Sequence, residues 1–257
     1  MTKLSINVNK LATIRNARGK NNPDVVASSL ELIKLGAEGI TVHPRPDERH
    51  IRHSDVYELK KAIDAQHPGI EFNIEGYPSE DFLKMVEEVR PAQCTLVPDP
   101  PDAITSNAGW RVSENLELLS QVAKRMIAKK IRTSVFVDPA TMDAEQYNLL
   151  KKIGIDRVEL YTERFAETHG QSEGQAVVED YAASAALART AGLGINAGHD
   201  LSLENLTALI TAIPWIDEVS IGHALVCDAL WLGFRETIQR YLKCIEDGAR
   251  AAKAAQR

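Results

Sequence analysis

Cysteine is scarce in this chain of 257 residues, which has only Cys94, Cys227 and Cys244, far apart in the sequence. An odd and scattered set fits neither a disulfide framework nor a zinc cluster, so we expect three reduced, structural cysteines. The sequence also lacks a run approaching about 18 uninterrupted apolar residues, the length of a membrane-spanning helix, and an apolar N-terminal segment of signal-peptide length. These absences predict a cytoplasmic protein that does not associate with membranes.

A long basic block is missing as well. The formal net charge is −6, and lysine and arginine never form more than a short run, so the chain lacks the electrostatic footprint of a nucleic-acid-binding protein. Neither a P-loop nor a complete G-x-G-x-x-G motif is present, and nucleotide binding has no support. Separate basic residues are still available to bind small phosphorylated ligands.

The chain does have the length and the apolar content for one large core. Its 257 residues, 44% of them hydrophobic, match the usual size of a single α/β barrel, and we predict one domain over residues 1–257. Apolar runs alternate with helical patterns along the chain. The runs predict eight strands near residues 4–8, 39–42, 70–74, 93–97, 132–137, 156–161, 193–197 and 217–221.

Helices are expected between these strands. After a polar loop that includes residues 9–19, Asn22 is predicted as the N-cap of the first helix and Pro23 as its first residue. A further helix is predicted from Ser54 with Val56, Leu59 and Ile63 facing inward, and others near residues 79–89, 112–129, 143–153, 174–191, 203–212 and 234–257. An open, doubly wound sheet would show the same alternation, but eight units and polar residues at most strand ends favour a closed (β/α)8 TIM barrel.

Short polar clusters stand where the apolar runs end. His43, Arg45 and His50 lie in the segment HPRPDERHI after the second strand. Arginine offers a planar fork of donors for phosphate, and histidine exchanges protons near neutral pH. The segment alone is equally typical of a solvated surface loop, but its position after a strand favours a site at the C-terminal mouth of a barrel.

Two more clusters, NAGH at residues 196–199 and IGHA at residues 221–224, follow the last two strands. Their small residues allow the backbone to approach a ligand, and His199 is placed to donate or accept a proton. The loops after strands seven and eight commonly bind phosphate in such barrels, so the N–H groups of Gly222 and His223 are candidates for holding a dianion. A lone histidine is more often structural, and only the two neighbouring clusters together favour a site.

Two glutamates are predicted among apolar residues of strands, Glu71 on the third and Glu159 on the sixth. Burial raises the proton affinity of a carboxylate, which suits a general base near neutral pH. The alternative for each is a carboxylate held in a structural ion pair. If Glu71 serves the chemistry, Glu71→Gln is expected to abolish turnover and to leave the melting temperature unchanged or higher.

Arg15 and Arg18 follow the first strand in the segment RNARG and supply two more donors. Basic residues in two separate places suggest two phosphorylated ligands. The alternative is that one or both arginines only pair with carboxylates of nearby loops.

Together these motifs resemble the pyridoxine 5′-phosphate synthase family over essentially the whole chain. The resemblance rests on NVNKLATIRNARG, on G-x-T-V-H-x-R-x-D-x-R-H-I, on LVP at residues 96–98, and on NAGH and IGHA. It implies a (β/α)8 barrel with additional helices that assembles as a homo-octamer. The implied reaction condenses 3-amino-2-oxopropyl phosphate with 1-deoxy-D-xylulose 5-phosphate to pyridoxine 5′-phosphate, phosphate and water, with no cofactor and no metal.

The resemblance also implies roles for individual residues. The catalytic set is His43 and Glu71 as proton acceptors, His199 as a proton donor and Glu159 as a group that stabilises developing charge. Asn7, Arg18, Gly222 and His223 would bind the amino ketone phosphate, and Arg45, His50 and Thr105 the sugar phosphate, with Lys10 available for its phosphate or hydroxyls. Because reactive imines must be kept from water, we also expect the loop at residues 99–110 to close over the site.

Three positions depart from the family pattern. Asn9-Lys10 stands where Asp-His is more familiar, Tyr161 where a histidine is frequent, and Asp200 where a glycine usually follows the histidine. Lys10 cannot act as a neutral imidazole. Asp200 would repel a phosphate unless it is turned away, so it is left out of the predicted ligand set.

Two other functions stay open at this point. A metal-dependent barrel hydrolase would use His43, His199 and His223 as ligands, but no His-x-His on the first strand supports it, and insensitivity to chelators would remove it. A barrel that binds phosphosugars after losing its activity is suggested by Lys10, Tyr161 and Asp200. Substrate binding without turnover would be its signature.

Overall fold

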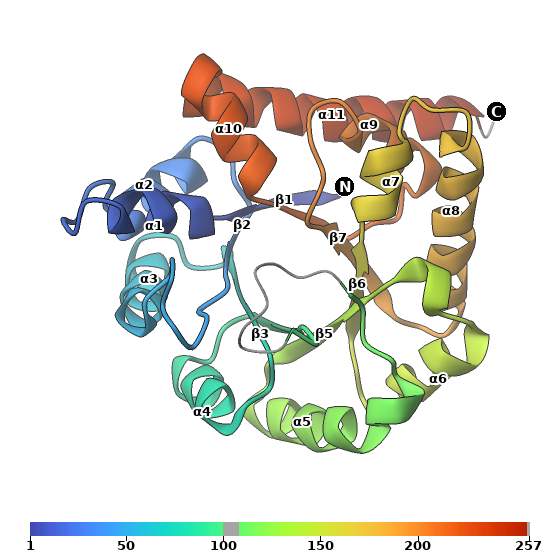
Figure 1. Ribbon diagram of the computed structural model, residues 1–257, viewed down its shortest axis with the longest axis horizontal. Helices are drawn as coiled ribbons and strands as arrows, with labels where there is room; N and C mark the ends of the chain where they lie inside the picture. Colours follow the sequence, from blue (N-terminus) through green and yellow to red (C-terminus); the bar gives the residue numbers. More distant parts are fainter. Residues whose placement is uncertain (100–107, 256–257) are drawn as a thin grey trace.

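The strands of this protein close into one parallel barrel in the computed structural model, which describes residues 1–99 and 108–255 (Figure 1). Each strand pairs with the next in the chain, and the eighth pairs with the first. The strands are β1 (Lys3–Asn7), β2 (Gly39–Val42), β3 (Glu71–Gly76), β4 (Gln93–Leu96), β5 (Arg132–Val137), β6 (Arg157–Tyr161), β7 (Gly194–Gly198) and β8 (Glu218–Ile221). The closed barrel is therefore confirmed over the open sheet.

Helices surround the barrel on all sides (Figure 1). Those that were expected are α2 (Val25–Lys34), α3 (His53–Gln66), α4 (Glu80–Val89), α5 (Leu116–Lys129), α6 (Ala144–Lys152), α8 (Gly174–Thr190), α9 (Leu206–Ala212) and α11 (Phe234–Ala255). The additional ones are α1 (Asn9–Asn16), α7 (Glu163–Thr168) and α10 (His223–Leu232), with short 3-10 turns η1 (Ser113–Asn115) and η2 (Pro139–Thr141). None of the helices in the described part of the chain is both long and apolar enough to cross a membrane.

Two sequence predictions near the N-terminus are wrong. Most of the expected polar loop at residues 9–19 is helix α1, because Leu11, Ala12 and Arg15 recur at helical spacing and are buried on one face. The N-cap of α2 is Asp24 rather than Asn22, since the Asp24 carboxylate accepts a hydrogen bond from the backbone N–H of Ala27 at 2.9 Å.

Side chains along the strands alternate between an apolar outer face and a polar interior. Outward residues such as Leu4 and Ile40 join the core between barrel and helices. Polar residues fill the interior, where the Ser5 and Thr41 hydroxyls lie 2.8 Å apart. The Asn196 amide donates to Gln93 Oε1 at 3.4 Å and joins β7 to β4, which are not neighbours in the sheet, so this bond spans the interior. The interior therefore carries polar groups from one end of the barrel to the other.

Candidate active site

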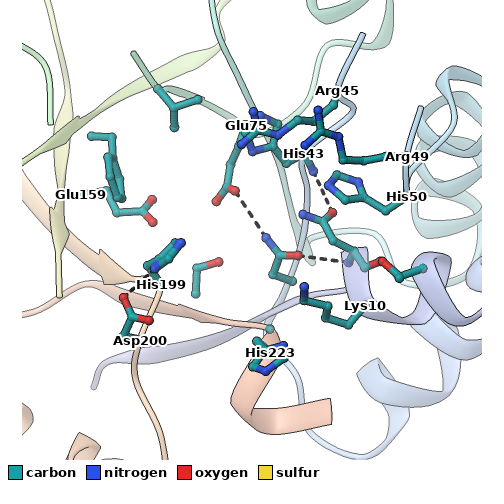
Figure 2. A pocket seen from close by; sticks show the side chains of 17 residues that line it. Lys10, His43, Arg45, Arg49, His50, Glu75, Glu159, His199, Asp200 and His223 are labelled. Atoms are coloured by element: carbon teal, nitrogen blue, oxygen red, sulfur yellow. Dashed lines mark hydrogen bonds and ion pairs between the residues drawn. The ribbon is translucent and has the colours of Figure 1, made fainter. Parts of the chain in front are cut away.

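A pocket with a volume of about 570 Å3 opens at the carboxyl ends of the strands (Figure 2). Strand ends and the loops and helices that follow them supply its wall, as expected for the mouth of a (β/α)8 barrel. Its lining residues are Asn7, Asn9, Lys10, Thr13, His43, Arg45, Arg49, His50, Glu75, Val97, Phe136, Glu159, His199, Asp200, Ser220, Gly222 and His223. Nine of the predicted site residues are thus brought together with groups that the sequence did not single out.

Charge divides the pocket into two sides (Figure 2). One side carries a basic group made of Lys10, Arg45, Arg49 and His50, which we call the basic cluster. The other side carries Glu159, His199 and Asp200 from β6 and the end of β7, and Glu75 of β3 lies between the two. The basic cluster suits a phosphate, while buried carboxylates and an imidazole suit proton transfer.

The basic cluster is held in place by carboxylates and by the start of α1. Arg45 is buried and donates to Asp99 at 2.7 Å, and Arg49 donates to Asp47 at 2.8 Å. The side chain of Asn9 accepts a hydrogen bond from the backbone N–H of His43 at 3.0 Å and so joins α1 to the loop after β2. The cluster is therefore positioned before a ligand arrives.

Two imidazoles are neutral near pH 7, that of His50 within the basic cluster and that of His43 next to it. Burial and the charge of Arg45 lower the pKa of His43 well below its usual value and that of His50 to about 4. His50 Nδ1 accepts a hydrogen bond from the backbone N–H of Ile51 at 2.9 Å, so the neutral ring carries its proton on Nε2. His43 can therefore accept a proton, and His50 can donate a hydrogen bond.

Two buried carboxylates face the pocket from β3 and β6. Burial raises the pKa of Glu159 to about 7, and burial together with the nearby Glu159 raises the pKa of Glu75 well above its usual value. The Glu75 carboxylate accepts from Asn7 at 3.4 Å. Gly198 leaves the space that Glu159 fills, because a Cβ at position 198 would lie 2.5 Å from Glu159 Oε1. A carboxyl with a pKa of about 7, as in Glu159, exchanges protons near neutral pH.

Glu71 does not lie in this pocket, and its predicted place in the site is wrong. It is the first residue of β3, at the amino ends of the strands, where its carboxylate pairs with Arg132 and lies 3.8 Å from Lys3 and from Arg157. Glu75 lies four residues further along the same strand and is the carboxylate of β3 in the pocket. The structure thus bears out the ion-pair alternative for Glu71.

Neither arginine of the RNARG segment lines the pocket. Arg15 is buried and makes a two-pronged ion pair with Asp55, at 2.5 and 2.8 Å, so it has the structural role considered as the alternative. Arg18 is exposed. Thr105 and most of the loop at residues 99–110 lie outside the described residues.

Gly222 and His223 form the edge of the pocket where β8 passes into α10. Gly222 is the N-cap of this helix and His223 its first residue. A Cβ at position 222 would lie 3.0 Å from both Cβ and the carbonyl oxygen of Asn7, so the close approach of β8 to β1 requires glycine here. The free N–H groups of the first helical turn and the helix dipole favour an anion at this edge.

His199 stands directly after β7 with a φ of 95°, a left-handed backbone that is uncommon for residues other than glycine. Its Nδ1 lies 2.5 Å from Oδ2 of Asp200, and its ring packs edge-on against Tyr161 with centroids 5.3 Å apart. The Asp200 carboxylate is thus directed at the imidazole.

Sequence reasoning missed several lining residues, and some of them carried a signal. The alternation Glu71-x-Asn73-x-Glu75 puts all three side chains on one face, and the strand end at Gly76 identifies Glu75 as the one near the mouth. Arg49 belongs to the same segment as Arg45. Thr13, Phe136 and Ser220 carried no comparable signal.

Histidines considered as metal ligands do not form a metal site. Within residues 1–99 and 108–255, no three or more His, Cys, Asp or Glu side chains are grouped so as to hold a metal ion. His43, His199 and His223 line one pocket but are not such a group.

Residues 4–247 match the family described as "Pyridoxal phosphate biosynthesis protein PdxJ". Among curated relatives, the pyridoxine 5′-phosphate synthase of Phocaeicola vulgatus is 54% identical over 245 residues, covering 95% of this chain and 99% of the relative. The enzyme of the same name from Cytophaga hutchinsonii is 54% identical over 243 residues, covering 95% and 98%.

Solved structures with little sequence identity share the fold. A 3-hexulose-6-phosphate synthase aligns with a TM-score of 0.64 at 12% identity, covering 95% of this chain and 100% of that one. A 3-keto-L-gulonate-6-phosphate decarboxylase from Vibrio cholerae aligns with a TM-score of 0.63 at 13% identity, covering 95% and 97%.

Proposed function

Because this chain belongs to the family of the pyridoxal phosphate biosynthesis protein PdxJ, we propose that its pocket performs the pyridoxine 5′-phosphate synthase reaction. In this reaction 3-amino-2-oxopropyl phosphate and 1-deoxy-D-xylulose 5-phosphate condense to pyridoxine 5′-phosphate, with release of phosphate and water. The observation that supports it is the pairing, in one pocket, of a basic cluster with a carboxyl whose pKa is raised to about 7, Glu159, and a neutral imidazole, His43.

Two anion-binding regions of the pocket suit two phosphorylated substrates. The basic cluster, which includes Lys10, Arg45 and His50, is the proposed place for the sugar phosphate. Gly222 and His223, at the start of α10, are the proposed place for the amino ketone phosphate, beside Asn7. Holding both substrates in one orientation replaces a bimolecular encounter by a positioned one, which lowers the barrier by several kcal/mol, of order 7–11 in well-oriented systems.

The proton-transfer roles fall to four groups around the substrates. Neutral His43 accepts a proton, and Glu75 takes the acceptor role that the resemblance had implied for Glu71. Glu159 stabilises positive charge that develops as the carbon–nitrogen bond forms, and His199 donates a proton to the leaving oxygen. Condensation, loss of water and phosphate, and ring closure are all proton-transfer steps, so these residues need no redox cofactor.

Four further predictions from the sequence belong to the proposed function. The described pocket is formed by one chain, and Arg18 of that chain does not line it. If Arg18 binds the amino ketone phosphate, another copy of the chain in the implied homo-octamer supplies it. Light scattering of the purified protein measures that assembly, and cell fractionation tests the cytoplasmic location. Binding of Thr105 to the sugar phosphate and closure of the loop at 99–110 are tested by Thr105→Ala kinetics with that substrate.

The experiment that tests the proposed function mixes purified, chelator-treated protein with both substrates. Absorbance of pyridoxine 5′-phosphate and release of inorganic phosphate are followed together, with each substrate alone as the control. We expect the two products to appear at equal rates and only when both substrates are present. Binding of both substrates without product would overturn the proposal and support the inactive phosphosugar-binding barrel instead.

A further inference from the structure

Two of the three departures from the family pattern meet at one imidazole. Tyr161 packs its ring edge-on against His199, with an interplanar angle of 78°. Asp200 places its carboxylate 2.5 Å from His199 Nδ1 (Figure 2). The remaining departure is Asn9-Lys10, and Lys10 lies on the other side of the pocket (Figure 2). The contact with Tyr161 sets the plane of the His199 ring, and the contact with Asp200 engages its Nδ1.

We propose that Asp200 is a positioning residue for the reaction: by accepting the Nδ1–H of His199, it makes Nε2 the nitrogen that exchanges a proton with the substrate. This inference rests on the proposed function, in which His199 is the proton donor. Asp200 itself does not need to touch the substrate, because its carboxylate is directed at the imidazole.

The backbone around Asp200 holds the carboxylate in this place. The backbone N–H of Asp200 donates to Thr162 Oγ1 at 3.3 Å, and its carbonyl oxygen accepts from the Asn205 amide at 3.1 Å. Thr162 Oγ1 in turn donates to the carbonyl oxygen of Gly198 at 2.7 Å, which ties the turn to the end of β7. None of these contacts uses the side chain of residue 200, so they survive a change of that side chain.

The chemical consequence follows from the two nitrogens of imidazole. A neutral ring whose Nδ1–H is bound to a carboxylate has its free lone pair on Nε2, and the carboxylate also stabilises the ring once Nε2 is protonated. The same arrangement orients the histidine in hydrolases that pair it with an aspartate. A carboxylate in a phosphate-binding pocket would repel the phosphate. Asp200 avoids this because its carboxylate is directed at the imidazole of His199.

Other groups also face the imidazole of His199. Glu159 lies close enough to interact electrostatically with the imidazole, and so does His43 across the pocket. The ring of Tyr161 covers one side. Variants of Asp200 must therefore be compared with a protein in which these three groups are unchanged.

The test compares Asp200→Asn and Asp200→Gly with Glu204→Gln, an exposed acid in the same loop. We expect kcat to fall roughly 10- to 100-fold in Asp200→Gly, the usual range for a hydrogen bond to a charged group, while both KM values stay within about twofold. Asp200→Asn keeps an acceptor without the charge and is expected to lose less. The alkaline limb of the kcat profile moves to lower pH in both variants, and Glu204→Gln matches the unchanged protein.

A second measurement reports the tautomer without any turnover. In protein with 15N-labelled histidine, the signals of His199 are assigned by their absence from His199→Gln. We expect Nδ1 to be protonated in the unchanged protein and the proton to redistribute between the nitrogens in Asp200→Gly. An unchanged tautomer and pH profile in Asp200→Gly would overturn the proposal. An active His199→Gln variant would instead overturn the role of His199, and a protein without synthase activity the proposed function.

Discussion

Glu71 and Glu75 lie on the same face of β3 but at opposite ends of the barrel. Four residues separate them, and at about 3.3 Å per residue the two carboxylates are roughly 13 Å apart along the strand. Glu71 pairs with Arg132 at the amino ends of the strands, whereas Glu75 faces the pocket with a raised pKa. Strand β3 thus carries one carboxylate that forms a structural ion pair, Glu71, and one that lines the pocket, Glu75.

This relationship predicts opposite outcomes for two matched substitutions. Glu75→Gln removes a proton acceptor from the pocket and is expected to lower kcat by roughly 10²- to 10⁴-fold, with a melting temperature that is unchanged or higher. Glu71→Gln breaks the ion pair with Arg132 and is expected to lower the free energy of unfolding by about 1–3 kcal/mol and to leave kcat within a few-fold. Steady-state kinetics and urea unfolding measure the two effects.

Each variant serves as the control for the other because both exchange a buried glutamate of β3 for glutamine. Loss of turnover in Glu71→Gln at unchanged stability would restore the prediction that Glu71 is a catalytic proton acceptor. It would contradict the structural role of Glu71 and the catalytic role of Glu75.

The stability of the protein should depend on pH through Glu218, at the start of β8. Burial raises the pKa of this carboxyl from 4.5 to about 7, so the folded state binds the proton more tightly than the unfolded chain does. Its contribution to stability is present below pH 4.5 and is lost as the pH rises through 7, by about 3 kcal/mol in all.

The Glu218→Gln variant isolates this effect, since glutamine does not titrate. We expect the difference in free energy of unfolding between Glu218→Gln and the unchanged protein to grow in favour of the variant between pH 5 and pH 8. Urea unfolding at both values measures it. An equal difference at the two pH values would show that Glu218 does not ionise in this range.

Phosphate binding by the basic cluster is tested at Arg49, which the sequence analysis did not select. Arg49→Ala removes a charged donor from the pocket and is expected to raise the KM for the sugar phosphate roughly 10-fold or more, with a smaller change in kcat. Arg18→Ala tests the earlier assignment in the same assay. A raised KM for the amino ketone phosphate in Arg18→Ala would place that arginine in a site supplied by another copy of the chain, and unchanged kinetics would remove it.

Chelation is expected to leave the reaction unchanged. The proposed steps use carboxylates, imidazoles and arginines of the chain, so initial rates before and after extensive EDTA dialysis should agree within error. Loss of activity on dialysis that returns with a single divalent ion would revive the metal-dependent reading with His43, His199 and His223.

Most of the fold was open to prediction because it depends on local patterns. The alternation of apolar runs and helical faces located all eight strands within two residues of their boundaries. Helix α1 was missed because its sequence, NKLATIRN, is polar on most faces, and the buried position of Arg15 is visible only once Asp55 is beside it. The cap at Asp24 was missed because Asn22 carries the same kind of side chain two residues earlier.

The sequence alone determined the barrel, the residue types of the site and the strand ends at which they gather, since periodicity and strand termini are local properties of the chain. Only the tertiary structure decided which of the inward-facing residues of a strand lies at the pocket, as for Glu75 rather than Glu71 on β3. It also decided which charges pair, as for Arg15 with Asp55 and His199 with Asp200. Pairing and depth depend on how separate strands and loops are brought together, and that information is not contained in any one segment.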